Sequence, residues 1–581
     1  MATSPASSEL FAALSRCRSA FVGVAVISGL VNLLYLTGSF FMLEVYDRVI
    51  PSRSIPTLIG LGGLALILYV FQGLIEILRS RILTRVGATL DESLSERVFD
   101  IVVRGSLKQT ASSDGLLPLR DLDQVRAFLS GIGPSAFFDL PWMPIYLLIC
   151  FMFHPLIGVA ALTSAGILAL VGFVTDRATR GPAKMSTNHG VRRNGLAEAS
   201  RRNAEVLIVM GMQRWMTERW SHANRDYMQA QQRVSDIASG LGTLSKVFRM
   251  ALQSAVLALG AYLVINGQAS SGVIIASSIL VARALAPAEL AIASWKGFVQ
   301  ASQSWGRLSD LLEHLPVAAE HHPLPSPIRS LQVESLSVAP PGVYRLVVQD
   351  ATFSLQAGQV LGVIGPSASG KSCLVRGLVG IWPAARGTVR LDGAAIDQWS
   401  TGDLGPHIGF LPQEVELFAG SIAENIARFD PTASADDVLA AAQAAGVHEL
   451  ILRLPEGYDT RIGERGAGLS AGQRQRVGLA RALYGTPFLV ILDEPNANLD
   501  AEGEGALTRA ILSIRQRKGI CIVIAHRPSA LAAVDLILTM ADGRIQTFGP
   551  KDEVLKRVLR PAAMPVEPQR RVPVQPLREI A

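Results

Sequence analysis

The residues best suited to chemistry lie in the second half of the chain, in the segment GPSASGKS at 365–372. An apolar run precedes it and a helical pattern follows it, so the spacing GxxxxGKS predicts a glycine-rich phosphate loop rather than a chance turn. In such a loop, backbone N–H groups wrap phosphates, a lysine adds positive charge and a serine hydroxyl can bind Mg²⁺. The expected nucleotide-binding residues are Gly365, Pro366, Ser367, Ala368, Ser369, Gly370, Lys371 and Ser372.

Two carboxylates end a second apolar run, FLVILDE at 488–494. Asp493 is expected to hold Mg²⁺, directly or through water, and Glu494 to orient or deprotonate an attacking water. A buried strand followed by an acidic turn is the alternative, and the phosphate loop in the same domain favours the catalytic interpretation. Gln413 and His526 also end apolar runs. A lone glutamine or histidine there is usually a loop residue, and only the order of the motifs makes these two candidates.

A second pattern suited to anions, LSAGQ at 469–473, stands far downstream of the phosphate loop. Small residues ahead of a helix leave free N–H groups that hold anions. One nucleotide site has no need of two helix starts so far apart in sequence. The segment is therefore either an ordinary helix cap or part of a further site.

The elements that must position these motifs differ between the two halves of the chain. Of its 581 residues 49% are hydrophobic and 18% charged, which is too apolar for a soluble protein of this size. The apolar residues concentrate before about Ser294. A membrane-spanning helix needs about 20 apolar residues. Six runs qualify: 21–43, 57–77, 137–153, 156–174, 247–265 and 273–292.

Basic residues gather in two long segments, between the second and third runs and between the fourth and fifth. Membrane topology explains them, and the net charge of +6, better than nucleic acid does. The same rule places both segments and both termini in the cytoplasm. Their apolar residues keep helical spacing, which favours helices that continue beyond the membrane over solvated loops. The first run lacks a small-residue cleavage site, so it is expected to be a retained span.

The third run is unusual because Asp139, Pro141 and Pro144 stand where it begins. A carboxylate there is costly unless it faces water, a partner or the interface. Helix-breaking prolines are tolerated where the backbone lines a cavity or packs on neighbours. Two interpretations stay open: Asp139 faces water, a partner or the interface, or it caps the helix at the membrane surface.

The predicted fold is an α-helical transmembrane domain of six spans followed by an α/β phosphate-loop ATPase domain. The four cysteines form no CxxC pair, so neither a disulfide framework nor a zinc site is expected. A segment rich in His and Pro predicts a linker, and the last residues are Pro-rich and basic, which predicts disorder. The expected parts are a cytoplasmic segment 1–20, the transmembrane domain 21–312, the linker 313–329, the ATPase domain 330–559 and the tail 560–581.

In their order along the chain, these motifs resemble those of an ATP-binding cassette. The resemblance implies a head-to-tail homodimer, in which LSAGQ of one subunit covers the ATP held by the other subunit's phosphate loop. Ala471 stands where a glycine is commoner. Ala339 and Pro340 stand near the place of the usual adenine-stacking aromatic residue, with Tyr344 nearby, so the adenine contact departs from the family pattern.

The resemblance also assigns roles. ATP and Mg²⁺ are the implied cofactors, and Glu494 and His526 the implied catalytic residues. Ser372, Gln413 and Asp493 are the implied metal contacts. The nucleotide contacts implied outside the phosphate loop are Gln413, Ser470, Gly472, Gln473, Asp493 and Asp500. The segment TRIGERG at 460–466 resembles the one that couples the cassette of exporters to their cytoplasmic helices.

The membrane half narrows the resemblance through segments such as EVYDRVIPSRSIPTL and FFDLPWMPIYLLICFMFHP. From about Phe21 to Val558 the chain is similar to bacterial type I secretion exporters of the PrtD kind. This implies a multi-pass inner-membrane protein with a cytoplasmic ATPase domain. Unfolded protein cargo with a C-terminal signal would leave through a periplasmic adaptor and an outer-membrane channel, with no role for nucleic acid.

Two other functions compete with protein secretion. An exporter of lipid, drug or peptide has the same architecture and is the alternative. A soluble cassette that remodels nucleic acid, fused to a membrane anchor, leaves the six spans and their helical extensions without a role.

Overall fold

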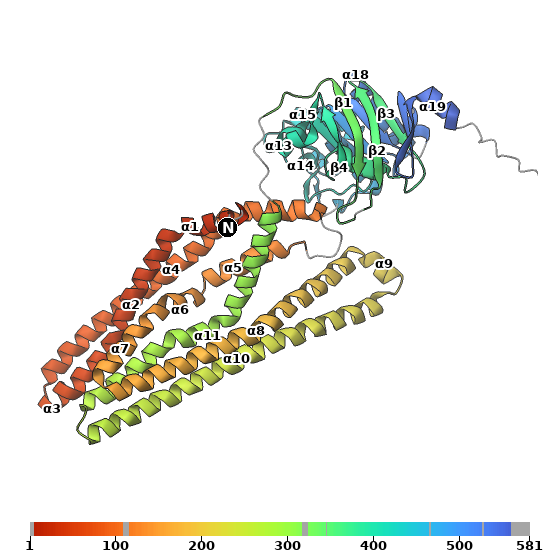
Figure 1. Ribbon diagram of the computed structural model, residues 1–581. Coiled ribbons are helices and arrows are strands. Elements are labelled where there is room, and N and C mark those ends of the chain that lie inside the picture. Colours follow the sequence, from red (N-terminus) through yellow and green to blue (C-terminus); the bar gives the residue numbers. More distant parts are fainter. Residues whose placement is uncertain are drawn as a thin grey trace, which may run out of the picture. The chain divides into compact units, whose positions relative to one another are not determined.

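The computed structural model describes residues 5–108, 115–315, 323–343, 345–463, 466–525 and 528–558. It divides into two compact units, Met1–Val317 and Ala318–Ala581, called here the membrane unit and the cassette (Figure 1). The division falls inside the expected linker 313–329, although the last helix of the membrane unit continues to His314. His526, Tyr344 and the tail 560–581 lie outside the described residues.

Six helices in the described part of the membrane unit are long and apolar enough to cross a bilayer, which confirms the six predicted spans. Each keeps about 18 or more residues with few charges, because a helix satisfies its backbone polar groups internally and only its side chains meet lipid. The helices that contain the spans are α2 Arg18–Glu44, α4 Ile55–Lys108, α6 Gly133–Asp139 with α7 Met143–Phe153, α8 Pro155–Arg202, α10 Gln213–Ile265 and α11 Ser271–His314.

Three of these helices are much longer than a bilayer requires. α4, α8 and α10 have 54, 48 and 53 residues. At 1.5 Å per residue each is roughly 70–80 Å long. α8 and α10 run side by side, joined by the short helix α9 Ala204–Val209 (Figure 1). The prediction that the basic segments form helices continuous with the apolar spans is confirmed for these three helices.

The remaining helices of the membrane unit are short. α1 Pro5–Arg16 lies within the segment expected only to be polar, and it buries Leu10 and Ala13 against α4 and α11. The other short elements are a π-helix Val45–Val49, α3 Ile50–Ser52, α5 Leu117–Leu129 and a 3₁₀ turn Leu140–Trp142.

The third span is interrupted where the sequence places its prolines. Pro141 and Pro144 lack the N–H group that a helix interior needs, and the 3₁₀ turn separates α6 from α7 at this point. α7 ends at Phe153, and the extended backbone of His154 turns the chain directly into α8. The third and fourth spans therefore form the tight hairpin that their spacing predicts.

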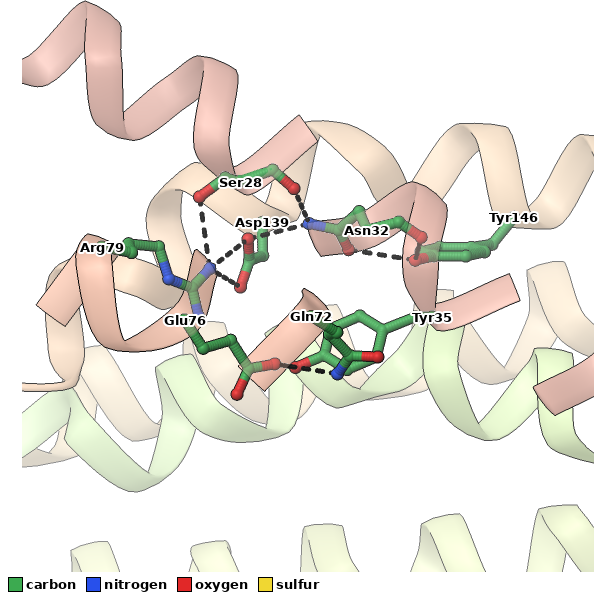
Figure 2. Close-up of polar contacts among 8 residues, drawn as sticks. All are labelled: Ser28, Asn32, Tyr35, Gln72, Glu76, Arg79, Asp139 and Tyr146. Carbon is green, nitrogen blue, oxygen red and sulfur yellow. Dashed lines mark hydrogen bonds and ion pairs between the residues drawn. The ribbon is translucent and has the colours of Figure 1, made fainter. Parts of the chain in front are cut away.

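Asp139 lies in a buried polar cluster and its side chain makes no capping hydrogen bond to the 3₁₀ turn that follows it, so the helix-cap interpretation is wrong (Figure 2). Arg79 Nη1 of α4 lies 3.1 Å from both carboxylate oxygens, and Asn32 Nδ2 of α2 donates to Oδ1 at 2.8 Å. Arg79 also donates to Ser28 Oγ, and the Tyr146 hydroxyl of α7 donates to the carbonyl of Asn32. A carboxylate in an apolar span is thus satisfied by a cation and an amide from two neighbouring spans.

A second contact, at the other end of the spans, joins the π-helix that follows α2 to the start of α11. Asp47, in the π-helix, accepts hydrogen bonds from the Gly272 N–H at 2.7 Å and from the Ser270 hydroxyl. Its carboxylate thus satisfies a free N–H at the start of α11, where negative charge is favourable. A Cβ atom on Gly272 would lie 2.7 Å from the Asp47 carboxyl carbon, so only glycine allows this approach.

Two large sheets and a two-stranded antiparallel sheet of β7 and β8 form the framework of the cassette. The six-stranded sheet has the order β12-β11-β3-β10-β9-β6, parallel except for β12, and a four-stranded antiparallel sheet has the order β2-β1-β4-β5. The strands are β1 Ser330–Val338, β2 Val348–Gln356, β3 Val360–Ile364, β4 Ala384–Leu391, β5 Ala394–Ala395, β6 Ile408–Leu411, β7 Gly420–Ser421, β8 Arg461–Ile462, β9 Leu489–Asp493, β10 Ile520–Ile524, β11 Leu536–Ala541 and β12 Arg544–Pro550.

Two separate hydrophobic cores cover the faces of the six-stranded sheet. Alternate residues of β9 point to opposite faces, so Leu489 and Ile491 belong to one core and Val490 and Leu492 to the other. Helix α12 packs in the first core, and α15, α17 and α18 pack in the second. The cassette helices are α12 Lys371–Leu378, α13 Thr401–Leu404, α14 Ile422–Ile426, α15 Ala435–Ala444, α16 His448–Leu452, α17 Ala471–Leu483, α18 Ala501–Gln516 and α19 Lys551–Val558.

Candidate nucleotide site

The predicted phosphate loop connects β3 to α12, at the carboxyl edge of the six-stranded sheet. Ligands of open α/β sheets bind at this edge. Gly370 has φ +97 and Ala368 φ +64, conformations that turn the backbone tightly into the helix. A Cβ atom on Gly365 would lie 2.2 Å from the carbonyl oxygen of Met540. Pro366, Ser367 and Ala368 are exposed, so the loop presents its backbone to solvent.

Lys371 folds back over this loop. Its Nζ donates to the carbonyl oxygens of Gly365 and Pro366, both at 2.9 Å, and the residue is 6% exposed. Burial lowers its pKa, while the carboxylates of Glu494 and Asp493 act in the opposite direction. The ammonium group is therefore held among oxygens at the place where an anion would meet the loop.

The carboxylate of Asp493 ends β9 next to the start of α12. A side-chain hydrogen bond joins it to Ser372, and burial raises its pKa. Asp493 Oδ1 and Ser369 Oγ are both buried without a hydrogen-bond partner. Buried polar atoms are nearly always paired. These two therefore indicate a missing ligand, and the set of a hydroxyl, a carboxylate and a phosphate loop has the hard oxygen donors that Mg²⁺ prefers.

Glu494 follows in a strained backbone conformation. Its φ is +49, in the left-handed region that non-glycine residues rarely adopt, and its N–H donates to the Ile524 carbonyl oxygen at 3.1 Å. Its own carbonyl oxygen accepts from Gln475 Nε2 at 3.2 Å. Such strain persists only where the surroundings fix it, and it concentrates at functional sites.

The remaining predicted residues of this edge lie on neighbouring strands. β6 pairs with β9 in parallel, with Leu411 opposite Leu492, so Gln413 follows the strand end beside Asp493 and is exposed. β10 ends level with Asp493, and the predicted His526 comes two residues later, outside the described part of the chain. The structure thus brings the phosphate loop, Asp493, Glu494 and Gln413 to one edge of the sheet.

The segment LSAGQ begins α17 as a capping box. Ser470 Oγ accepts from the Gln473 N–H, and the Gln473 side chain accepts from the Ser470 N–H. A Cβ atom on Gly472 would lie 2.7 Å from the Asn498 carbonyl oxygen, so this glycine lets α17 approach the loop after β9. Ser470 and Ala471 are exposed. The motif is therefore a helix cap in this chain, with its outer face open.

The two helix starts that the sequence predicts to hold anions lie on different faces of the sheet. The phosphate loop leads into α12 and its core, whereas LSAGQ leads into α17, which packs in the opposite core with α15 and α18. The cap is thus not the second wall of its own chain's phosphate loop. This arrangement is the one expected if LSAGQ serves a different nucleotide from the one held by Lys371.

Sequence reasoning missed the residues that tie α17 to the loop after β9. Gln475 is 2% exposed and donates to the carbonyl oxygens of Glu494 and Pro495, and it accepts from Asn498 Nδ2 at 3.0 Å. Arg476 Nη2 contacts Asp500 Oδ1 at 2.5 Å, and Asp500 also caps α18. The pKa of Asp500 is lowered, first by the Gly503 N–H. Gln475 and Arg476 stand in the polar run 473–476, and the sequence carries no signal that separates them from Gln473 and Arg474.

Comparison with protein-family models assigns both units. Residues 21–285 match the ABC transporter transmembrane region, and residues 348–497 match the ABC transporter model.

Comparison with characterised proteins gives relatives along nearly the whole chain. The type I secretion system ATP-binding protein PrsD of Rhizobium meliloti is 61% identical to this chain. The aligned region covers 95% of this chain and 94% of PrsD. The cyclolysin secretion/processing ATP-binding protein CyaB of Bordetella pertussis is 30% identical, over 94% of this chain and 77% of CyaB. The alpha-hemolysin translocation ATP-binding protein HlyB of Escherichia coli is 28% identical over the same shares.

Among solved structures, a bacterial Atm1-family ABC exporter with ATP bound matches 93% of this chain and 96% of its own, with a TM-score of 0.80 and 23% identity. At that identity the match shows a shared fold.

Proposed function

Because the chain belongs to the ABC transporter family, and within it to the type I secretion transporters, we propose that it drives secretion of unfolded protein from the cytoplasm. It is a multi-pass membrane ATPase that binds ATP. One observation carries the proposal: the likeness to a type I secretion protein covers the membrane unit as fully as the cassette. Cassettes are common to all ABC transporters, whereas the membrane unit is the part that must suit the cargo.

In the proposed site, Lys371 leaves the carbonyl oxygens of Gly365 and Pro366 to meet the outer phosphates of ATP. Ser372 and Asp493 would hold Mg²⁺, with Gln413 reaching it from the neighbouring strand end. The metal, when bound, supplies positive charge that offsets the developing charge on the phosphate oxygens. Asp493 Oδ1 and Ser369 Oγ would then gain the partners that they lack.

Glu494 is the proposed base for the attacking water. Its backbone is held by the Ile524 carbonyl oxygen and by Gln475, so its side chain starts from a fixed point. General-base positioning of this kind contributes about 10²–10⁴-fold to a rate. His526 is proposed to act beside it, as the resemblance implies.

The proposed active form is a homodimer with two shared sites. Ser470, Gly472 and Gln473 of one subunit would complete the site at Lys371 of the other, with Asp500 beside them. The exposed N-terminus of α17 and its place on the opposite face from α12 support this, because neither serves the phosphate loop of its own chain. Closed two-fold symmetry is the commonest arrangement of identical chains.

We place the protein in the bacterial inner membrane with the cassette in the cytoplasm, since the basic helical extensions follow the positive-inside rule. A periplasmic adaptor and an outer-membrane channel would complete the path, and the cargo would carry a C-terminal signal. Nucleic acid has no role in this proposal.

Secretion by cells with and without this gene tests the function. With adaptor and channel supplied, cargo should reach the medium only with the wild-type chain, and Lys371→Ala should abolish both secretion and phosphate binding. The purified protein, in a bilayer of fixed composition, should change its ATPase rate when a C-terminal fragment of the cargo is added, but not with drugs or added lipid. Stimulation by a drug or lipid, with no protein exported, would contradict the proposal.

A further inference from the structure

An apolar groove opens on the membrane unit between α7, α8 and α11. It encloses a cavity of about 580 Å³, within the ~300–1,000 Å³ typical of ligand sites. Leu147, Phe173 and Ile292 are among its walls, and Gly166 and Gly172 form part of the α8 side. A Cβ atom on Gly166 would meet no heavy atom within 4 Å, so the absence of a side chain there keeps the groove open.

The groove has the length of one leaflet of the bilayer. α8 begins at Pro155, and Asp176 lies about 31 Å further along it at 1.5 Å per residue, which matches the ~30 Å hydrocarbon core. The α8 wall runs from Ala165 to Asp176, about 16 Å. It therefore covers the half of the core next to the basic helical extension, a depth that one acyl chain fills.

The end of the groove carries the groups of a membrane–water interface. The Trp295 indole N–H donates to Asp176 Oδ1 at 3.0 Å, and Trp is enriched at that level of the bilayer. Arg180 Nε contacts the same carboxylate oxygen at 2.6 Å, which balances its charge. Arg180 and Lys184 follow Asp176 at successive four-residue steps, so they lie on one side of α8, about 6 and 12 Å beyond the hydrocarbon.

A second pocket of about 300 Å³, with charged and polar side chains among its lining, lies one helical turn further along α8 and α11. Arg180, Lys184, Ser302 and Gln303 are among its lining residues. Gln303 Nε2 donates to the Arg180 carbonyl oxygen at 3.2 Å, while its Oε1 is enclosed without a hydrogen-bond partner. Because Asp176 is already paired with the Arg180 guanidinium, the ammonium group of Lys184 gives the pocket a net positive charge.

We propose that the groove and the pocket together bind an anionic phospholipid. One acyl chain lies along α8 past Gly166 and Gly172, and the headgroup phosphate meets Arg180 and Lys184. The flexible stem of Lys184 lets its ammonium group return to the phosphate level. The match of apolar length to one leaflet and of positive charge to the headgroup layer favours this lipid over a soluble ligand. The lipid site does not depend on the identity of the cargo. Evidence against lipid binding would therefore not count against the proposed secretion function.

Tryptophan quenching in the full-length protein tests the site. The protein is reconstituted into phosphatidylcholine bilayers that contain increasing fractions of phosphatidylglycerol brominated on its acyl chains. Trp295 is one of seven tryptophans, so its signal is taken as the difference between the wild type and Trp295→Phe. That signal should fall at a low fraction of phosphatidylglycerol, and brominated phosphatidylcholine should quench it only at much higher fractions.

Two variants locate the lipid. Each basic residue at an anionic headgroup contributes about fivefold, so Arg180→Gln with Lys184→Gln should lower the preference for phosphatidylglycerol about 30-fold. The control Arg177→Gln with Arg192→Gln removes the same charge from α8 outside the pocket and should leave the preference unchanged. Gly166→Leu should fill the groove and remove the quenching, whereas Gly60→Leu on α4, where a Cβ atom also meets nothing within 4 Å, should not.

Three results would overturn the assignment. Quenching by both lipids without preference would show a groove open to bulk lipid. An equal effect of the two charge variants would show a general surface effect. No quenching of Trp295 by either lipid would mean that a second copy or the cargo covers the groove.

Discussion

Removal of Arg79 should destabilise the membrane unit more than removal of any exposed arginine of α4. Arg79→Leu takes away the cation that lies 3.1 Å from both oxygens of Asp139 and leaves that carboxylate with the amide of Asn32. The two side chains are 12% and 10% exposed. Breaking one partner of such a buried pair costs about 3–5 kcal/mol. At about 2–3 °C per kcal/mol for a unit of this size, the Tm should fall by roughly 6–15 °C.

The assay is thermal unfolding of purified protein in one detergent at one heating rate, because membrane proteins often unfold irreversibly and their apparent Tm depends on rate. Asp139→Asn alone leaves the guanidinium unpaired and should also lower the Tm. The double variant Arg79→Leu, Asp139→Asn removes both charges and should recover most of the loss, since the cost comes from the unpaired charge. Arg85→Leu, an exposed position of the same helix, is the matched control, and its Tm should stay within about 2 °C of the wild type.

A Tm for Arg79→Leu equal to that of the Arg85→Leu control would refute the reasoning, because it would mean that Asp139 finds water or protonates at no cost. Strictly additive losses in the double variant would refute it as well, since uncoupled residues do not form a pair.

Three further predictions concern the cassette. Glu494→Gln should retain ATP binding while hydrolysis falls about 10²–10⁴-fold, and ATP should then hold two subunits together in size-exclusion chromatography; turnover at the wild-type rate would remove Glu494 from catalysis. Mixing Lys371→Ala subunits with Ser470→Arg subunits should leave one composite site with both defects and one with neither, so mixed dimers should hydrolyse ATP where each parent does not; complete inactivity would mean that the sites are not shared in this way or must work together. Burial raises the pKa of Asp493, so the folded protein holds this proton more tightly than the unfolded chain, and without nucleotide its stability should fall as pH rises through that raised pKa. Asp493→Asn has no carboxyl proton to lose, so it should not lose stability in this way. Its denaturation midpoint, compared with that of the wild type, should therefore rise more at pH 8 than at pH 5. A rise that does not depend on pH would contradict the raised pKa of Asp493.

The sequence was sufficient wherever function depends on local spacing. The phosphate loop, the FLVILDE strand and the six spans follow from residues close together in the chain, and the structure confirms the fold class that they predict. The roles of the individual site residues stay predictions. Gly370 and Gly472 are typical: sequence shows that a glycine stands there, whereas the atoms that exclude a side chain come from β-strands and loops far along the chain.

Contacts between distant segments could not be predicted in the same way. Arg79 counted as one of many basic residues that set topology, and only the structure shows it bound to Asp139, 60 residues later. Periodicity identifies the buried face of a helix but not its partner. For the same reason the sequence could not show that α12 and α17 pack on opposite faces of one sheet.

The contact between Asp47 and the start of α11 has a consequence for biogenesis. Its two donors lie 223 and 225 residues after Asp47 in the chain. The contact therefore forms only after the ribosome has made almost the whole membrane unit. The Arg79–Asp139 pair spans 60 residues and is available much earlier. In a nascent chain that stalls before Gly272, Asp139 can therefore already be paired with Arg79. Asp47 still lacks its partners at the start of α11. The Asp47 contact thereby marks a chain translated past the start of its last membrane helix, and an inserted fragment that ends earlier leaves the end of the first span without this anchor.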